Sequence, residues 1–217
     1  MLLSKIIEIL DDWCPPYDAE EFDNVGLLIG ELKSEITKAV ITLDITDDII
    51  DECISNGANL IICFHPLFIS DPKTSETDER INKYIIRCLK NNINVYCIHT
   101  NLDNNPFGTS YQLGKILSLK NQEILVNNEN NNLKGMGSIG SMSHSINDYN
   151  FLEFLKDKLN LKYLRHSKLL DKKIKKVAIL AGSGSFAINN AIFKKADSLI
   201  SADIKYHDFF KPNKKIL

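Results

Sequence analysis

The sequence predicts an α/β protein with two similar lobes, each built on a mostly parallel or mixed sheet with flanking helices. First, short apolar runs typical of buried strands alternate with segments of helical periodicity along the chain. Second, the pattern from Lys38 to Ile62 returns at nearly the same spacing from Lys176 to Ile200, which indicates a duplicated βαβ unit. We expect a first lobe over residues 1–126 and a second, incomplete lobe over residues 133–217.

The first lobe is expected to begin with an amphipathic helix. Apolar residues repeat at helical spacing from Leu2 to Leu10, and Pro15 and Pro16 prevent the helix from continuing. The elements expected next are a short strand at 27–30, a strand at 38–43, a helix capped by Thr46 and ended by Gly57, a strand at 60–63, a helix at 78–90, a strand at 93–98 and a helix at 110–117. The polar stretch 70–77 is expected to be a surface loop that overhangs the candidate site.

The stretch Asn127 to Asn132 is nearly all Asn, which predicts either a linker or the tip of a long hairpin. Beyond it the alternation of helices and strands begins again. The elements expected there are a helix at 151–159, a strand at 177–181, a helix at 187–195 and a strand at 198–201.

The composition is that of an ordinary globular protein, with 217 residues, 44% hydrophobic and 25% charged. A net charge of -2 supplies no basic field for phosphate backbones, so we expect no nucleic-acid partner. Five cysteines without a Cys-x-x-Cys motif favour a reducing compartment. The first apolar run contains Lys5 and Glu8, so we expect no signal peptide; no apolar stretch is long enough to span a bilayer. We therefore expect a cytoplasmic protein with no membrane partner.

Two apolar runs each end in a histidine, at His65 and at His99, and Asp103 follows the second histidine by four residues. Parallel strands deliver such residues to one edge of a sheet, where open α/β folds place their sites. Imidazole and carboxylate groups suit a divalent ion such as Zn, Mn or Fe. The sequence therefore predicts a metal site made by His65, His99 and Asp103.

Other interpretations stay open. His99 and Asp103 alone also fit a simple turn in which Asp103 binds backbone amides. Cys63 and Cys97 would complete a Cys₂His₂ zinc site with the histidines, although their apolar surroundings favour buried thiols. The run Gly182 to Ser185 follows a strand and opens a helix, so it fits either an anion-binding turn or a simple strand-to-helix turn.

The chain resembles the NIF-three-like family, also called the GTP cyclohydrolase I type 2 homologues. The motifs that carry the resemblance run through nearly the whole chain: Phe22-Asp23-Asn24-Val25-Gly26-Leu27, Leu43-Asp44-Ile45-Thr46, His65-Pro66-Leu67, His99-Thr100-Asn101-Leu102-Asp103, Gly182-Ser183-Gly184 and Asp203-Ile204-Lys205-Tyr206-His207. The resemblance implies an α/β fold of two lobes, a dinuclear metal site and assembly into toroidal homohexamers.

The chain also departs from the family pattern. The family's first metal motif is His-His-Pro, whereas this chain has Phe64-His65-Pro66. The family's later His and Glu ligands would begin where this chain stops, at Leu217. The resemblance therefore implies a depleted site that holds one ion, with His65, Asp103 and His99 as its expected ligands.

Three hypotheses for the function follow. The first is a metal-dependent hydrolase of a nucleotide-like or other small substrate, in which bound water is the nucleophile and Asp203 or His207 moves the proton. The second is a degenerate, non-catalytic oligomeric scaffold, which the replacement by Phe64 favours. A third, an anion-binding module, would use the Gly182 to Ser185 loop without a metal.

Overall fold

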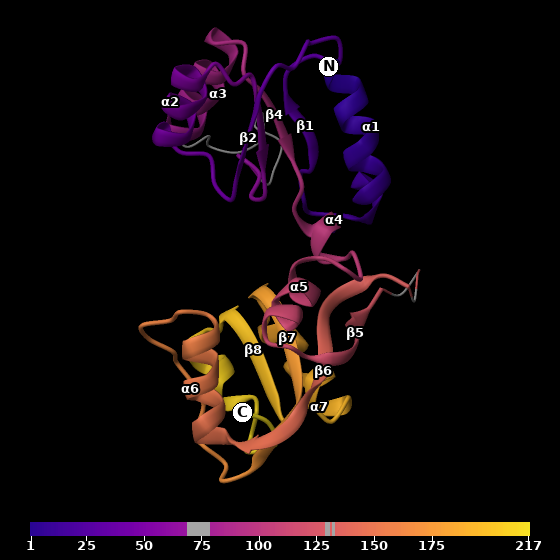
Figure 1. Cartoon of the computed structure of the whole chain (residues 1–217), viewed down its shortest axis with the longest axis vertical. Coiled ribbons are helices and arrows are strands. Elements are labelled where there is room, and N and C mark those ends of the chain that lie inside the picture. The colour runs from indigo at the N-terminus through magenta and orange to yellow at the C-terminus, as the bar shows by residue number, and fades with distance from the viewer. Residues whose placement is uncertain (69–78, 129–130, 132) are drawn as a thin grey trace. The chain divides into compact units, whose positions relative to one another are not determined.

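The chain folds into two compact units, Met1–Leu102 and Asp103–Leu217, in a computed structural model that describes residues 1–68, 79–128, 131 and 133–217 (Figure 1). Each unit is built on one four-stranded sheet with flanking helices. The predicted α/β fold with two similar lobes is therefore confirmed. The loop expected at 70–77 lies outside the described residues.

The sheet of the first unit has the strand order β1-β4-β3-β2. Its strands are β1 (Gly26–Ile29), β2 (Ala39–Thr42), β3 (Leu60–Cys63) and β4 (Asn94–Cys97). Strands β2, β3 and β4 run parallel, while β1 pairs antiparallel with β4. In the register of the central pair, Cys63 lies opposite Cys97, so the residues that follow these two cysteines leave the sheet at the same edge.

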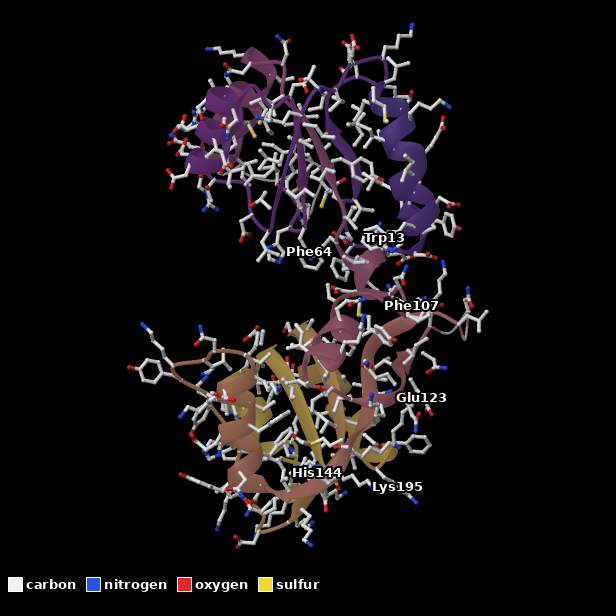
Figure 2. All side chains as sticks on the ribbon, viewed as in Figure 1. Trp13, Phe64, Phe107, Glu123, His144 and Lys195 are labelled. Carbon is white, nitrogen blue, oxygen red and sulfur yellow. The ribbon has the colours of Figure 1, made fainter. Side chains whose placement is uncertain are left out.

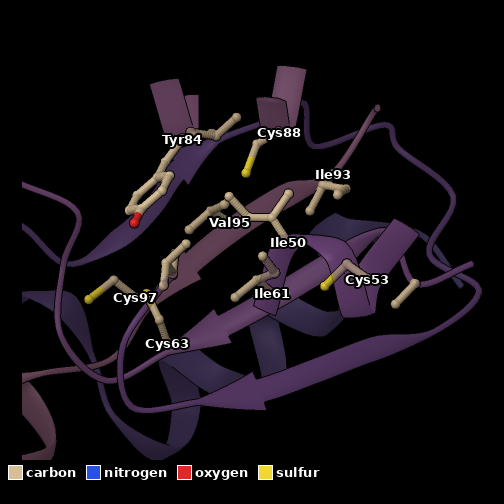
Figure 3. Packing of buried hydrophobic residues seen from close by; sticks show 12 residues of the cluster. Ile50, Cys53, Ile61, Cys63, Tyr84, Cys88, Ile93, Val95 and Cys97 are labelled. Carbon is tan, nitrogen blue, oxygen red and sulfur yellow. The ribbon is translucent and has the colours of Figure 1, made fainter. Parts of the chain in front are cut away.

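Helices cover both faces of this sheet because each strand alternates its side chains between them. Figure 1 shows α2 (Asp47–Asn56) and α3 (Glu79–Lys90) on one side of the strands and α1 (Leu3–Trp13) on the other. Ile61 and Val95 pack with the first pair of helices, as Figure 3 shows, and Leu60 and Tyr96 pack with α1. A 3₁₀ turn, η1 (Pro16–Asp18), follows α1.

The ends of α2 follow the sequence prediction. The Thr46 hydroxyl accepts a hydrogen bond from the Ile49 amide at 3.3 Å and so caps the first turn. Gly57 closes the helix in the left-handed region with φ of 66°, where a residue without Cβ meets no strain. These two residues mark the start and the end of the helix in the βαβ unit formed by β2, α2 and β3.

The second unit has the strand order β5-β6-β7-β8, with β7 and β8 parallel and the other pairs antiparallel. Its elements are α4 (Thr100–Asp103), which crosses the boundary between the units, α5 (Thr109–Ile116), β5 (Lys120–Asn127), β6 (Gly135–Asn147), α6 (Asp148–Lys158), β7 (Lys173–Ser183), η2 (Ser185–Ala187), α7 (Ile188–Phe193), β8 (Ser198–Asp203) and η3 (Tyr206–Phe210). The parallel β7-α7-β8 crossover repeats the arrangement of the first unit.

The Asn-rich stretch connects two strands of one sheet. Strands β5 and β6 on either side of it pair antiparallel, with Asn127 opposite Gly135. The antiparallel pairing of the flanking strands is that of a hairpin, while residues 129, 130 and 132 of the stretch itself lie outside the described residues. The sequence places the change of lobe between residues 126 and 133, whereas the structure divides the units earlier, between Leu102 and Asp103.

The second sheet is also covered on both faces. Val177 and Ile179 of β7 pack with Phe151 of α6, and the alternate residues Ala178 and Leu180 pack in the cluster that contains α7.

None of the helices within the described ranges combines the length and the apolar character needed to cross a membrane.

Candidate metal-binding site

His65 and His99 lie side by side at the carboxyl edge of the first sheet. Each follows its strand by two residues, and the parallel register of β3 and β4 brings the two positions together. Their ring centroids are 5.6 Å apart with an interplanar angle of 79°. The structure thus places two of the three predicted ligands next to each other.

A buried carboxylate holds the His99 ring. His99 Nδ1 lies 2.9 Å from both carboxylate oxygens of Asp23, whose side chain has no solvent exposure. Thr100 donates to the same carboxylate twice, from its amide at 3.0 Å and from its hydroxyl at 2.5 Å, and the Asn24 amide donates at 2.8 Å. Burial by itself raises the pKa of Asp23, but these hydrogen bonds outweigh it and lower the pKa to about 2.

The His65 ring has an equivalent but exposed partner. Its Nδ1 lies 2.8 Å from Asp44 Oδ1, and the side chains of His65 and Asp44 are 49% and 65% exposed. The exposed fraction of the His99 side chain is only 17%. Water therefore competes with the His65 pair far more than with the His99 pair.

The carboxylates decide which ring nitrogen is available. Asp23 is ionised near neutral pH, so its oxygens accept a hydrogen bond from Nδ1 of His99, and Nε2 is the ring nitrogen that does not face this carboxylate. The Asp44 carboxylate faces Nδ1 of His65 in the same way. A carboxylate on the remote nitrogen of a histidine is the usual arrangement around metal-ligating imidazoles.

The spacing of the rings also suits one ion. Two imidazoles on a tetrahedral zinc, with Zn–N bonds of about 2.0–2.1 Å, have ring centres about 5 Å apart. The observed 5.6 Å is close to this value. Across the described ranges, however, no group of three or more His, Cys, Asp or Glu side chains is arranged to hold a metal ion. The first unit therefore offers a pair of nitrogen donors, which suits an open site rather than a closed structural one.

The other predicted site residues lie in the second unit. Asp103 ends α4, and its carboxylate accepts a hydrogen bond from the Thr109 hydroxyl. Asp203 ends β8, and His207 lies in η3 with its ring centroid 5.2 Å from that of Tyr206. The roles of Asp103 as a ligand and of Asp203 and His207 in proton transfer stay predictions.

Sequence reasoning did not assign a role to Asp23 or Asp44. Both lie in the motifs Phe22-Asp23-Asn24 and Leu43-Asp44 that carry the family resemblance. The sequence feature that could have indicated these two residues is a carboxylate next to the apolar residues before or after a predicted strand.

The cysteines near the histidines are core residues. All five cysteines are free and buried, and Figure 3 shows Cys63 and Cys97 among the apolar side chains of the first unit. A hydrogen bond with the Cys63 thiol and burial raise the pKa of Cys97, and burial raises the pKa of Cys88 to about 11. The thiolate that zinc requires is therefore disfavoured at Cys97 and Cys88, in agreement with the expectation of buried thiols.

The Gly182 to Ser185 loop binds groups of its own chain. The Gly184 amide donates to the Ser201 hydroxyl at 2.9 Å, and a Cβ at Gly184 would lie 2.7 Å from that oxygen. Asp208 accepts a hydrogen bond from Ser185, and this bond, after that from Lys211, lowers the pKa of its carboxyl. This glycine therefore permits close packing at a strand-to-helix turn, which supports the simpler of the two interpretations.

Comparison with known proteins covers both units. The profile of the Duf34/NIF3 (NGG1p interacting factor 3) family matches residues 1–216. A GTP cyclohydrolase 1 type 2 homolog of Clostridium perfringens is 35% identical over 207 residues, which are 95% of this chain and 79% of that protein. The corresponding homolog of Clostridium acetobutylicum is 32% identical over 206 residues, covering 94% of this chain and 77% of that protein.

Solved structures agree with this result. A Staphylococcus aureus hypothetical protein has a TM-score of 0.89 at 29% identity, covering 98% of this chain and 82% of that chain. Reduced HcgD from Methanocaldococcus jannaschii has a TM-score of 0.77 at 30% identity, covering 99% of this chain and 84% of that chain. The resemblance found in the sequence motifs is confirmed, and the chain belongs to the Duf34/NIF3 family.

Proposed function

We propose that the chain binds a divalent ion of Zn, Mn or Fe type through Nε2 of His65 and His99, and acts as a metal-dependent hydrolase of a nucleotide-like or other small substrate. The observation that carries the proposal is the pair of adjacent imidazoles whose Nδ1 atoms each face a carboxylate. This arrangement leaves two nitrogen donors oriented by groups that do not themselves need to bind the ion.

The residues have distinct tasks in this proposal. His65 and His99 hold the ion, and Asp23 and Asp44 fix the tautomer and plane of each ring. When bound, such an ion polarises a substrate oxygen and makes water a nucleophile near neutral pH. Catalytic sites of this kind usually have a third protein ligand, and Asp103 stays the sequence-based proposal for it.

Proton transfer and the substrate class are the finer parts of the proposal. Asp203 or His207 would move the proton, because both are exposed groups with suitable chemistry. The nucleotide-like substrate is carried over from relatives that are called GTP cyclohydrolase 1 type 2 homologs. With two imidazoles in the first unit, one ion is the expected occupancy.

Metal titration of the purified full chain tests the proposal. The chain is stripped with a chelator, titrated with Zn²⁺, Mn²⁺ or Fe²⁺ by calorimetry, and its metal content is measured by mass spectrometry. We expect about one equivalent to bind, and His65→Ala and His99→Ala to lose it. His144→Ala is the matched control, because His144 lies on β6 of the second unit with Ser143 as its hydrogen-bond partner.

Less than about a tenth of an equivalent in the presence of excess metal would reject the metal site. Release of product from a panel of nucleotides, measured with and without metal, tests the hydrolase. Binding of metal without any turnover would favour the alternative, a non-catalytic scaffold.

We further propose that the chain assembles into a homohexamer, which is the assembly that the family resemblance implies. The support is an apolar sheet edge: β2 is an edge strand, Ile41 is 80% exposed on it, and Leu43 follows it with 65% exposure. Light scattering should give a hexameric mass that Ile41→Lys reduces. A monomer at all protein concentrations would contradict this.

The five free thiols support a reducing compartment, so we propose the cytoplasm.

A further inference from the structure

Phe64 contacts both histidines of the candidate site. Its ring centroid lies 5.1 Å from that of His65 at an interplanar angle of 65°, and 5.2 Å from that of His99 at 87°. Because the two imidazoles are themselves 5.6 Å apart, the three rings form a closed triangle of edge-to-face contacts. Figure 2 labels Phe64 where the chain leaves β3.

The backbone at Phe64 is held from two neighbouring strands. The Phe64 amide donates to the Thr42 carbonyl at 3.1 Å, and the Phe64 carbonyl accepts from the Cys97 thiol at 3.3 Å. The next amide, that of His65, donates to the Leu43 carbonyl at 2.9 Å. These bonds fix the backbone at Phe64 and therefore the direction in which its side chain leaves the chain.

A second contact matters because one hydrogen bond does not fix an imidazole plane. A ring held only at Nδ1 still pivots about that bond, and its Nε2 then sweeps over a range of directions. Contact with an aromatic ring removes this freedom. The need is greatest at His65, since its hydrogen bond to Asp44 is exposed to water whereas that of His99 to Asp23 is buried.

We propose that Phe64 is a positioning residue, which fixes the planes of His65 and His99 so that both Nε2 atoms face one ion. The inference rests on the proposed metal binding and adds a residue that cannot itself coordinate a metal. Phe64 thus has a task at the site although it supplies no donor atom.

Substitutions at Phe64 separate the aromatic ring from apolar bulk. Phe64→Leu keeps an apolar side chain and removes the ring, and we expect zinc to bind about tenfold more weakly with unchanged stoichiometry, since two aromatic contacts are lost. Phe64→Tyr keeps the ring and should retain the affinity within about twofold. Phe107→Leu is the matched control, because Phe107 makes a similar contact with Tyr111, at 5.2 Å and 87°, in the second unit.

A metal-free measurement gives a second readout. NMR relaxation of the imidazole carbons in the stripped protein should show a more mobile His65 ring in Phe64→Leu, and a smaller change at His99. Phe64→Met replaces the leucine variant if the latter fails to fold by circular dichroism.

The outcomes are distinguishable. Equal zinc affinity and equal ring mobility in the wild type and Phe64→Leu would overturn the role of Phe64 and leave the metal site intact. No zinc binding by the wild type would reject the proposed function; the imidazole mobility alone then decides whether Phe64 fixes the rings. Weaker binding in Phe64→Leu that Phe64→Tyr does not show supports the inference.

Discussion

Asp23 loses its contact with water on folding, yet its carboxyl is easier to ionise in the folded chain than in the unfolded one. Hydrogen bonds from His99, Thr100 and Asn24 outweigh the cost of burial and lower the pKa from 3.8 to about 2. A depressed folded-state pKa stabilises the protein above the unfolded value, and this contribution is lost as the pH falls from about 4 to about 2.

We expect Asp23→Asn to lower the free energy of unfolding by about 2 kcal/mol near pH 6, because the shift of the pKa corresponds to that energy. The deficit should shrink as the pH falls from about 4 to about 2, since the carboxyl is protonated first in the unfolded chain and only near pH 2 in the folded chain as well. Urea denaturation at a series of pH values measures it.

Asp44→Asn is the control for this substitution, because the exposed pair of Asp44 with His65 should contribute less than about 1 kcal/mol. A deficit for Asp23→Asn that is equal at pH 6 and pH 3 would contradict the assigned hydrogen bonds.

The positions of site residues at strand ends could be predicted from the sequence. Their hydrogen-bond partners could not, because these lie far away along the chain. His65 and His99 end apolar runs, so parallel pairing alone brings them together. Their partners Asp44 and Asp23 are 21 and 76 residues away, and no local pattern indicates such pairing. Phe64 shows the same limit, because its replacement of a histidine suggested loss of function while its contacts with both rings needed coordinates.

At the scale of elements, the start of α6 depends on one buried carboxylate. Asp148 is only 3% exposed and accepts hydrogen bonds from the amides of Tyr149, Leu170 and Asp171 at 2.7–2.9 Å. These bonds join the helix to the end of the loop before β7. They also lower the pKa of Asp148 against the effect of burial.

Asp148→Ala leaves these three amides without the carboxylate that accepts from them, so we expect a loss of about 3 kcal/mol in the free energy of unfolding. Amide hydrogen exchange at Leu170 and Asp171 should speed up. Asp157→Ala, an exposed position on the same helix, should stay within about 0.5 kcal/mol of the wild type. Unchanged exchange at both amides in Asp148→Ala would show that the carboxylate does not hold the loop.

Elements with strong periodicity were predicted and those without it were missed. The Thr46 cap, the Gly57 end of α2 and the apolar strands β3 and β4 are each indicated by a few neighbouring residues. Strands β5 and β6 were not predicted, because their sequences are polar or glycine-rich and their stability comes from pairing across the sheet.

At the scale of the whole molecule, each unit has a hydrophobic core of its own. Ile61 is fully buried in the first unit and Phe151 is 1% exposed in the second. Truncating either to alanine leaves a cavity that should cost about 2–5 kcal/mol. We expect Ile61→Ala to reduce amide protection mainly in residues 1–102 and Phe151→Ala mainly in residues 103–217.

Hydrogen exchange with mass spectrometry, read separately for peptides of each unit, measures this difference, and each variant serves as the control for the other. Equal loss of protection in both units from either substitution would mean that the chain unfolds as one cooperative body.

The positions of the cysteines make them a built-in probe of local unfolding. Cys14, Cys53, Cys63, Cys88 and Cys97 are all the cysteines of the chain, all are buried, and all belong to the first unit, which carries His65 and His99. A maleimide or an aromatic disulfide reagent can therefore modify the native protein only when that unit opens. Its rate of labelling measures the opening of that unit alone, without any engineered probe.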